Sequence, residues 1–69
     1  METARIDVQG MSCQGCVASV TRVLKDVPGV ADVSVTLQPS VATVAYDANR
    51  TNVAALKSAI EYAGYGVAA

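Results

Sequence analysis

The sequence contains no histidine, phenylalanine or tryptophan, and only two of its 69 residues are cysteine. Without histidine, the chain lacks the side chain most often used for acid–base catalysis at neutral pH, which is also the commonest metal ligand. Five basic and six acidic residues give a net charge of −1. A chain with no basic excess lacks the electrostatic signature of nucleic-acid binding and of attachment to anionic membranes.

Long apolar segments are also absent. The longest uninterrupted apolar run, Val53 to Leu56, has four residues, whereas a membrane-spanning helix needs about 20. Residues 1–5 lack the apolar segment of a secretory signal peptide, so we expect a cytoplasmic protein. A chain of 69 residues is too short to divide into two cores, so we expect one domain over residues 1–69.

Hydrophobic periodicity predicts six elements. Three segments alternate between apolar and polar side chains, as half-buried strands do: residues 3–8, 32–37 and 41–46. Two segments carry apolar side chains at helical spacing: residues 14–26 and 53–63. Pro28-Gly29 ends the first helix, Asn52 is the expected N-cap of the second, and Gly64 follows the second helix where glycine is preferred. A short last strand is expected from Tyr65 to Ala68.

The resulting order, β-α-β-β-α-β, is that of ferredoxin-like folds. The turn Gln38-Pro39-Ser40 is short enough to join the second and third strands as an antiparallel hairpin. We therefore predict an α+β open-faced sandwich, with a four-stranded antiparallel sheet and two helices on one of its faces.

Both cysteines lie in one tetrapeptide, Cys13-Gln14-Gly15-Cys16, where the first strand joins the first helix. A disulfide across so short a loop would restrict the unfolded chain very little, so the pair requires a chemical explanation. We expect Cys13 to reach solvent from the loop. Cys16 falls in the first helical turn, where the positive end of the helix dipole stabilises a thiolate.

Two thiolates at this spacing can converge on one soft metal ion. A structural zinc site takes four protein ligands, and the sequence has no histidine and no second cysteine pair. Thiolates select Cu(I) and Zn(II) among biological ions, but zinc would have to borrow carboxylates or water here, which makes a weak site, whereas Cu(I) accepts two ligands. Ag(I) and Hg(II) are equally soft, and we expect them to bind as substitutes.

The motif Gly-Met-Ser-Cys-x-x-Cys in such a chain resembles the heavy-metal-associated domain family, over residues 3–68. The length and Tyr65 make it look most like the bacterial cytosolic copper chaperones, which pass Cu(I) to the N-terminal domains of copper-transporting P-type ATPases. The resemblance implies that Cys13 and Cys16 are the metal ligands and that the protein is not an enzyme. It places Met11, Ser12 and Tyr65 around the ligands, with Met11 buried below the loop.

The sequence departs from the family pattern at one position. Several bacterial chaperones have a histidine between the two cysteines, whereas this chain has Gln14-Gly15. A donor whose protonation changes near neutral pH is therefore missing from the motif.

We expect a monomer without metal, and an exposed site with two thiolates also permits a copper-bridged dimer.

Three other functions remain open at this point. The chain could be a metal-binding domain of a copper ATPase or a mercury-binding protein, since both kinds of protein carry the motif. A Cys-x-x-Cys pair also occurs in dithiol-disulfide redox proteins, which would cycle with a defined reduction potential.

Several residues also have two interpretations. Met11 is either a third ligand through its thioether or a flexible residue that fills the core. Tyr65 either tunes the site or shields it from water, and Ser12 either caps the first helix or only occupies a turn. Arg22 and Lys25 either form a docking patch or are simply solvated.

Overall fold

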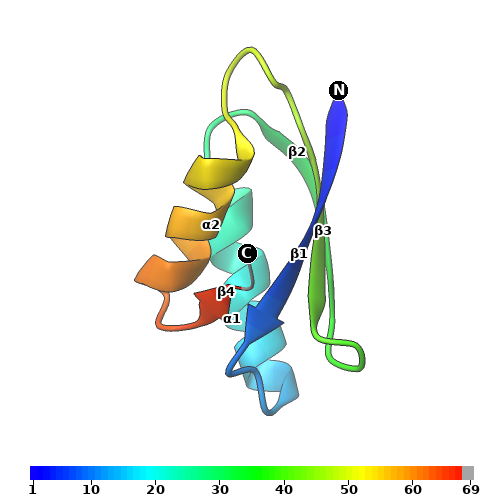
Figure 1. Cartoon of the computed structure of the whole chain (residues 1–69), viewed down its shortest axis with the longest axis vertical. Coiled ribbons are helices and arrows are strands. Elements are labelled where there is room, and N and C mark those ends of the chain that lie inside the picture. The colour runs from blue at the N-terminus through cyan, green and yellow to red at the C-terminus, as the bar shows by residue number, and fades with distance from the viewer. Residues whose placement is uncertain (68–69) are drawn as a thin grey trace.

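The computed structural model describes residues 1–67 (Figure 1). It contains six elements in the predicted order: β1 (Glu2–Gln9), α1 (Gln14–Lys25), β2 (Val30–Thr36), β3 (Val41–Tyr46), α2 (Val53–Tyr62) and β4 (Gly66–Val67). The last strand begins one residue later than predicted, and its predicted end at Ala68 lies outside the described residues.

The strands form one antiparallel sheet in the order β2-β3-β1-β4. Both helices cover the same face of this sheet (Figure 1). The predicted α+β open-faced sandwich is therefore confirmed.

The second strand is longer than its sequence pattern indicated. It begins at Val30, and the pairing with β3 shifts register between Val30 and Asp32. Such a bulge adds a residue on one strand and interrupts the alternation of side chains. The alternation starts cleanly only at Asp32, so the pattern predicts a strand from residue 32, whereas β2 runs from Val30 to Thr36.

The core fills the space between the sheet and the helices. Its fully buried large side chains come from every layer: Ile6, Val20, Leu24, Val44, Leu56 and Ile60. Tyr46 is buried with them, whereas Tyr62 is 92% exposed at the end of α2. No helix within residues 1–67 combines the length and the apolar character needed to cross a membrane.

The end of α2 sets the position of the chain that follows it. Gly64 has a φ of +99°, its N–H donates to the carbonyl of Glu61 at 2.9 Å, and the N–H of Tyr65 donates to the carbonyl of Ile60 at 3.3 Å. These two bonds and the left-handed glycine make a Schellman motif, which confirms the predicted role of Gly64. The motif reverses the chain sharply, so that Tyr65 turns back toward the start of α1.

The two helices begin differently. The predicted N-cap of α2 is confirmed, because the side chain of Asn52 accepts a hydrogen bond from the N–H of Ala55 at 2.9 Å. The N-cap of α1 is Cys13, which makes no side-chain capping bond, and the first turn of α1 contains no acidic residue. The first turn of α1 therefore has no side-chain cap, at the place where the cysteines lie.

Removing the cap of α2 tests this assignment. We expect Asn52→Ala to lower the free energy of unfolding by about 1 kcal/mol, since one N–H of the first turn loses its acceptor. Asn52→Asp keeps a side-chain oxygen and should stay close to wild type. Chemical denaturation of both variants measures the difference, and equal losses in the two would show that the cap bond is not the cause.

Candidate metal centre

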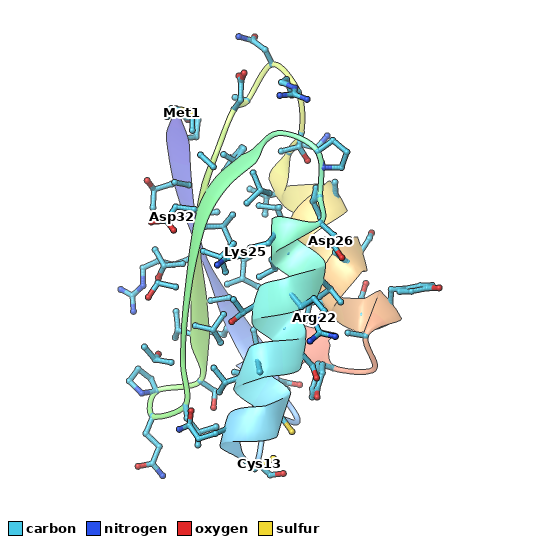
Figure 2. All side chains as sticks on the ribbon, turned by 180° about the vertical axis from the view of Figure 1, so that it is seen from behind. Met1, Cys13, Arg22, Lys25, Asp26 and Asp32 are labelled. Carbon is cyan, nitrogen blue, oxygen red and sulfur yellow. The ribbon has the colours of Figure 1, made fainter. Side chains whose placement is uncertain are left out.

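The two cysteines meet at one end of the molecule. Figure 2 places Cys13 at the N-terminal tip of α1, far from Met1 at the opposite end. The sulfur atoms of Cys13 and Cys16 lie 3.4 Å apart, and both residues are free thiols. Cys13 is exposed, as predicted, and Cys16 is half-buried.

The backbone around the pair explains this geometry. Gly10 follows β1 with a φ of +96°, a conformation that side chains disfavour, and it turns the chain out of the sheet. Cys13 is extended, with φ −156° and ψ 171°, and its carbonyl accepts hydrogen bonds from the N–H groups of Cys16 and Val17. Strand, loop and first helical turn thus hold the two sulfurs on one side of the chain.

The thiol of Cys16 is more acidic than an ordinary cysteine. Its pKa is lowered from 9.0 to about 6, mainly by hydrogen bonding from the backbone of Ser12 and then by the side chains of Tyr65 and Cys13. Each of these contacts favours the thiolate, which outweighs the opposing effect of partial burial. Cys16 is therefore mostly a thiolate at neutral pH, which is the form that binds metals.

Tyr65 completes the site from the other end of the sequence. A Cβ placed on Gly10 would lie 3.6 Å from Cδ1 of Tyr65, so the tyrosine ring packs on the loop that carries the cysteines. The pKa of Tyr65 is raised, first by its hydrogen bond with Cys16 and then by burial. The half-buried ring of Tyr65 thus lies over the loop that carries the cysteines, and whether it tunes or shields a metal site stays a prediction.

Met11 and Ser12 occupy different environments. Met11 is 8% exposed and belongs to the hydrophobic core, as the resemblance implied. This burial favours the core-filling interpretation over that of a third ligand. Ser12 is exposed and precedes the N-cap, so the helix is not capped by it; its backbone instead hydrogen bonds to Cys16.

One neighbour of the site was missed by the sequence analysis. The hydroxyl of Ser19 donates to the carbonyl of Gly15 at 3.1 Å, and Ser19 is also one of the groups that act on the pKa of Tyr65, which it lowers. Ser19 follows Cys16 by one helical turn, and residues three apart lie side by side on a helix. The spacing between Cys16 and Ser19 could be read from the sequence, but no local pattern indicated that Tyr65 would lie near Ser19.

The donor set suits a soft ion with few ligands. Among residues 1–67, no three cysteine, histidine, aspartate or glutamate side chains gather in one place. Two metal–sulfur bonds of about 2.3 Å each can span a sulfur–sulfur distance of at most about 4.6 Å. The sulfurs here are 3.4 Å apart, so both can contact one ion. Two sulfurs at an exposed end leave part of the coordination sphere open.

Removing the Tyr65 hydroxyl tests its contact with Cys16. We expect Tyr65→Phe to raise the pKa of Cys16 from about 6 toward 9.0, because the thiolate loses a donor. The pH dependence of alkylation measures this, with each variant in a Cys13→Ser background so that one thiol reacts; because Cys13 itself lowers the pKa of Cys16, the shift is read against Cys13→Ser alone and not against the value of about 6.

Tyr62→Phe is the matched control, since Tyr62 is 92% exposed. An equal shift in both variants, or none in Tyr65→Phe, would contradict the contact.

Because the folded-state pKa of Cys16 lies below the unfolded one, the contribution of Cys16 to stability is full above about pH 9 and is lost as the pH falls through about 6.

A ferredoxin-like sandwich with an exposed cysteine pair between β1 and α1 defines a class of small metal-binding domains. Residues 5–66 match the heavy-metal-associated domain, and the chain belongs to that family. It is 40% identical to the copper chaperone CopZ of Bacillus subtilis (strain 168) over 68 residues, which cover 99% of each chain. It also matches a copper-binding domain from HMA7, a P-type ATPase, with a TM-score of 0.96 and 35% identity, covering 99% of this chain and 92% of that one.

Relatives of other kinds carry the same domain. Copper-transporting ATPase 2 of Rhizobium meliloti (strain 1021) is 41% identical over 63 residues, which cover 91% of this chain but only 8% of the ATPase. The periplasmic component of the mercuric transport protein of Serratia marcescens is 38% identical over 64 residues, covering 93% of this chain and 70% of that protein. The family is therefore defined, and the choice among its members requires further argument.

Proposed function

We propose that this protein is a cytosolic copper chaperone, a carrier and not an enzyme. One Cu(I) is bound by the thiolates of Cys13 and Cys16 and passed to the N-terminal domain of a copper-transporting P-type ATPase. The observation that carries the proposal is the pair of sulfurs 3.4 Å apart at an exposed end of the fold. The match to the copper chaperone CopZ over 99% of both chains supports the proposal.

The two cysteines have different environments, and this suggests the order of transfer. Cys13 is exposed on the loop, whereas Cys16 is half-buried and hydrogen-bonded to Tyr65. A thiolate of the partner adds to the open side of the Cu(I), the bond to one cysteine of this chain then breaks, and a second thiolate of the partner repeats the step. Cu(I) keeps its oxidation state throughout, and each bond forms before another breaks, so the ion is never released to water. We expect Cys13, the exposed ligand, to meet the partner first.

The open coordination sphere also bears on selectivity. Zinc sites favour four ligands. Within residues 1–67, no histidine, further cysteine or carboxylate side chain joins the pair to make a group of three. Zn(II) would have to complete its shell with water, so we expect weak binding. Hg(II) shares the preference of Cu(I) for thiolates, and the mercuric transport relative makes a mercury carrier the second candidate.

The deciding experiment is an anaerobic titration of the reduced protein with Cu(I) against a competing chromophoric chelator, with Zn(II) and Hg(II) in parallel. We expect one Cu(I) to be retained per chain, with Zn(II) lost to the chelator. Transfer to an isolated ATPase domain then tests the carrier function. Failure to retain Cu(I) would overturn the proposal, and reduction of a protein disulfide by the chain would instead indicate a redox protein.

A further inference from the structure

The end of the molecule that carries the cysteines is built from uncharged residues. Figure 1 shows the start of α1 and the β2–β3 turn at this end. The N–H of Val8 donates to the carbonyl of Ser40 in that turn at 3.0 Å, and Tyr65, after α2, packs on Gly10. Three segments therefore meet here, and we call them the uncharged end: residues 8–21, 37–41 and 62–67.

The charged side chains lie in other parts of the chain. None of the five basic and six acidic residues falls within the uncharged end, although Asp7, Arg22 and Glu61 border it in the sequence. Arg22 and Lys25 lie in the last turn of α1, and Figure 2 shows both of them along the helix from Cys13. At a rise of 1.5 Å per residue, Arg22 lies about 9 Å further along the axis than Cys16. The two basic residues are thus set back from the cysteine pair.

One large aromatic side chain projects from the uncharged end. Tyr62 is the last residue of α2 and is 92% exposed. Met1, the other large hydrophobic residue that is exposed within residues 1–67, lies at the opposite end of the molecule (Figure 2). The buried residues of α2 are Leu56 and Ile60, so the Tyr62 ring is not needed for the core. Tyrosine is enriched at protein interfaces, because its rigid ring supplies a large contact area.

The proposed function requires a partner to cover this end, since the thiolates of the partner must reach the Cu(I). A charged residue of the partner that rested on the uncharged end would lose water without gaining a counter-charge. An uncharged partner surface avoids this cost, and it can pack on the Tyr62 ring. Apart from the thiolates themselves, the uncharged end also has no charge with which to steer a partner.

We propose that the uncharged end is the docking surface for the copper acceptor, that the acceptor is a domain whose own cysteine pair is surrounded by uncharged residues, and that Tyr62 is the aromatic anchor of the contact. The inference rests on the proposed function and specifies the chemistry of its partner. It places Arg22 and Lys25 outside the contact. Docking then depends on packing between two uncharged surfaces, and its rate depends little on salt.

Copper transfer to a second copy of this chain tests the proposal, because the cysteine end of that copy has the required chemistry. Cu(I)-loaded protein is mixed with a metal-free, isotope-labelled copy, and NMR exchange spectroscopy follows the transfer. We expect the rate to change by less than about threefold between about 0.02 and about 0.5 M salt, whereas electrostatic steering accounts for about 10–10³-fold in rate and is lost at high salt.

Substitutions at Tyr62 test the anchor. We expect Tyr62→Ser to slow the transfer about tenfold, which is within the range for aromatic anchors of interfaces. Tyr62→Phe keeps the ring and should transfer at the wild-type rate. Because Tyr62 is exposed, Tyr62→Ser should leave the fold and Cu(I) retention unchanged. The matched control is Arg22→Gln with Lys25→Gln, which removes two exposed charges of α1 and should not change the rate.

A reaction without metal supplies a second measurement. A Cys16→Ser copy carries Cys13 as a mixed disulfide with thiopyridine, which is an uncharged leaving group. A thiolate of a reduced wild-type copy attacks the Cys13 sulfur, a disulfide forms between the copies, and thiopyridone is released. The rate of release should be as insensitive to salt as copper transfer, and it should fall in the same way when the reduced copy carries Tyr62→Ser.

The two measurements separate the docking surface from the copper function. A tenfold or greater loss of rate at high salt, slower transfer in Arg22→Gln with Lys25→Gln, or an unchanged rate in Tyr62→Ser would overturn the proposed docking surface. If the wild type retains no Cu(I), the proposed function fails, while the disulfide reaction still decides whether two copies meet through the uncharged end.

Discussion

Replacing Cys13 by serine is expected to abolish Cu(I) retention and, at the same time, to stabilise the metal-free protein. The first effect follows from the loss of one of two sulfur ligands. Even the loss of a group that only orients a ligand typically costs about 10–100-fold in metal affinity, so we expect a loss of more than about 100-fold. Competition with a chromophoric chelator measures it directly.

The second effect follows from the position of Cys13 on α1. Cys13 is the N-cap, yet it makes no side-chain capping bond, whereas serine is among the best N-cap residues. The new hydroxyl can accept a hydrogen bond from a free N–H of the first turn, and we expect a gain of about 1 kcal/mol in the free energy of unfolding. Cys13 is exposed, so little packing is lost.

Cys16→Ser is the informative control for this prediction. Cys16 packs against the hydrophobic core and lies inside the helix, so its replacement should remove metal retention and lower stability. Opposite signs in the two variants would show that function, and not folding, keeps a cysteine at the N-cap. If Cys13→Ser retained Cu(I), or destabilised the protein as Cys16→Ser does, the assignment of Cys13 would be wrong.

Leu56→Ala is expected to have the largest effect on the fold. Leu56 is fully buried on α2, and truncating a buried leucine costs about 2–5 kcal/mol because a cavity remains. The free energy of unfolding is roughly 0.05–0.15 kcal/mol per residue, so its total is small in a chain of 69 residues. The loss of a buried leucine side chain therefore removes a large part of it. We expect the Tm to fall by more than about 10 °C, since about 4–8 °C is lost per kcal/mol in domains of this size.

Ser58→Ala, at an exposed position of the same helix, provides the comparison. Exposed substitutions away from special features usually change stability by less than about 0.5 kcal/mol. Thermal and chemical denaturation of the two metal-free variants should therefore differ clearly. Similar midpoints would mean that the α2 face at Leu56 does not form the core described.

The order of the elements and the place of the cysteine pair were readable in the sequence, because both depend on near neighbours. Alternation of side chains marked β1 and β3, helical spacing marked α1 and α2, and cap residues such as Asn52 and Gly64 marked their ends. The start of β2 was misplaced by the bulge after Val30, which disturbs the pattern on which such an inference depends.

The sequence by itself thus determined the fold class, the exposed Cys13 and the first-turn Cys16, since periodicity and helix ends are local properties of the chain. Only the tertiary structure decided what surrounds the sulfur of Cys16. Tyr65 is brought to the cysteine loop by the turn at Gly64 and the pairing of β4 with β1, and its ring packs beside Gly10. Contacts between residues far apart in the chain arise when the elements pack together, and no local pattern specifies the distances that result.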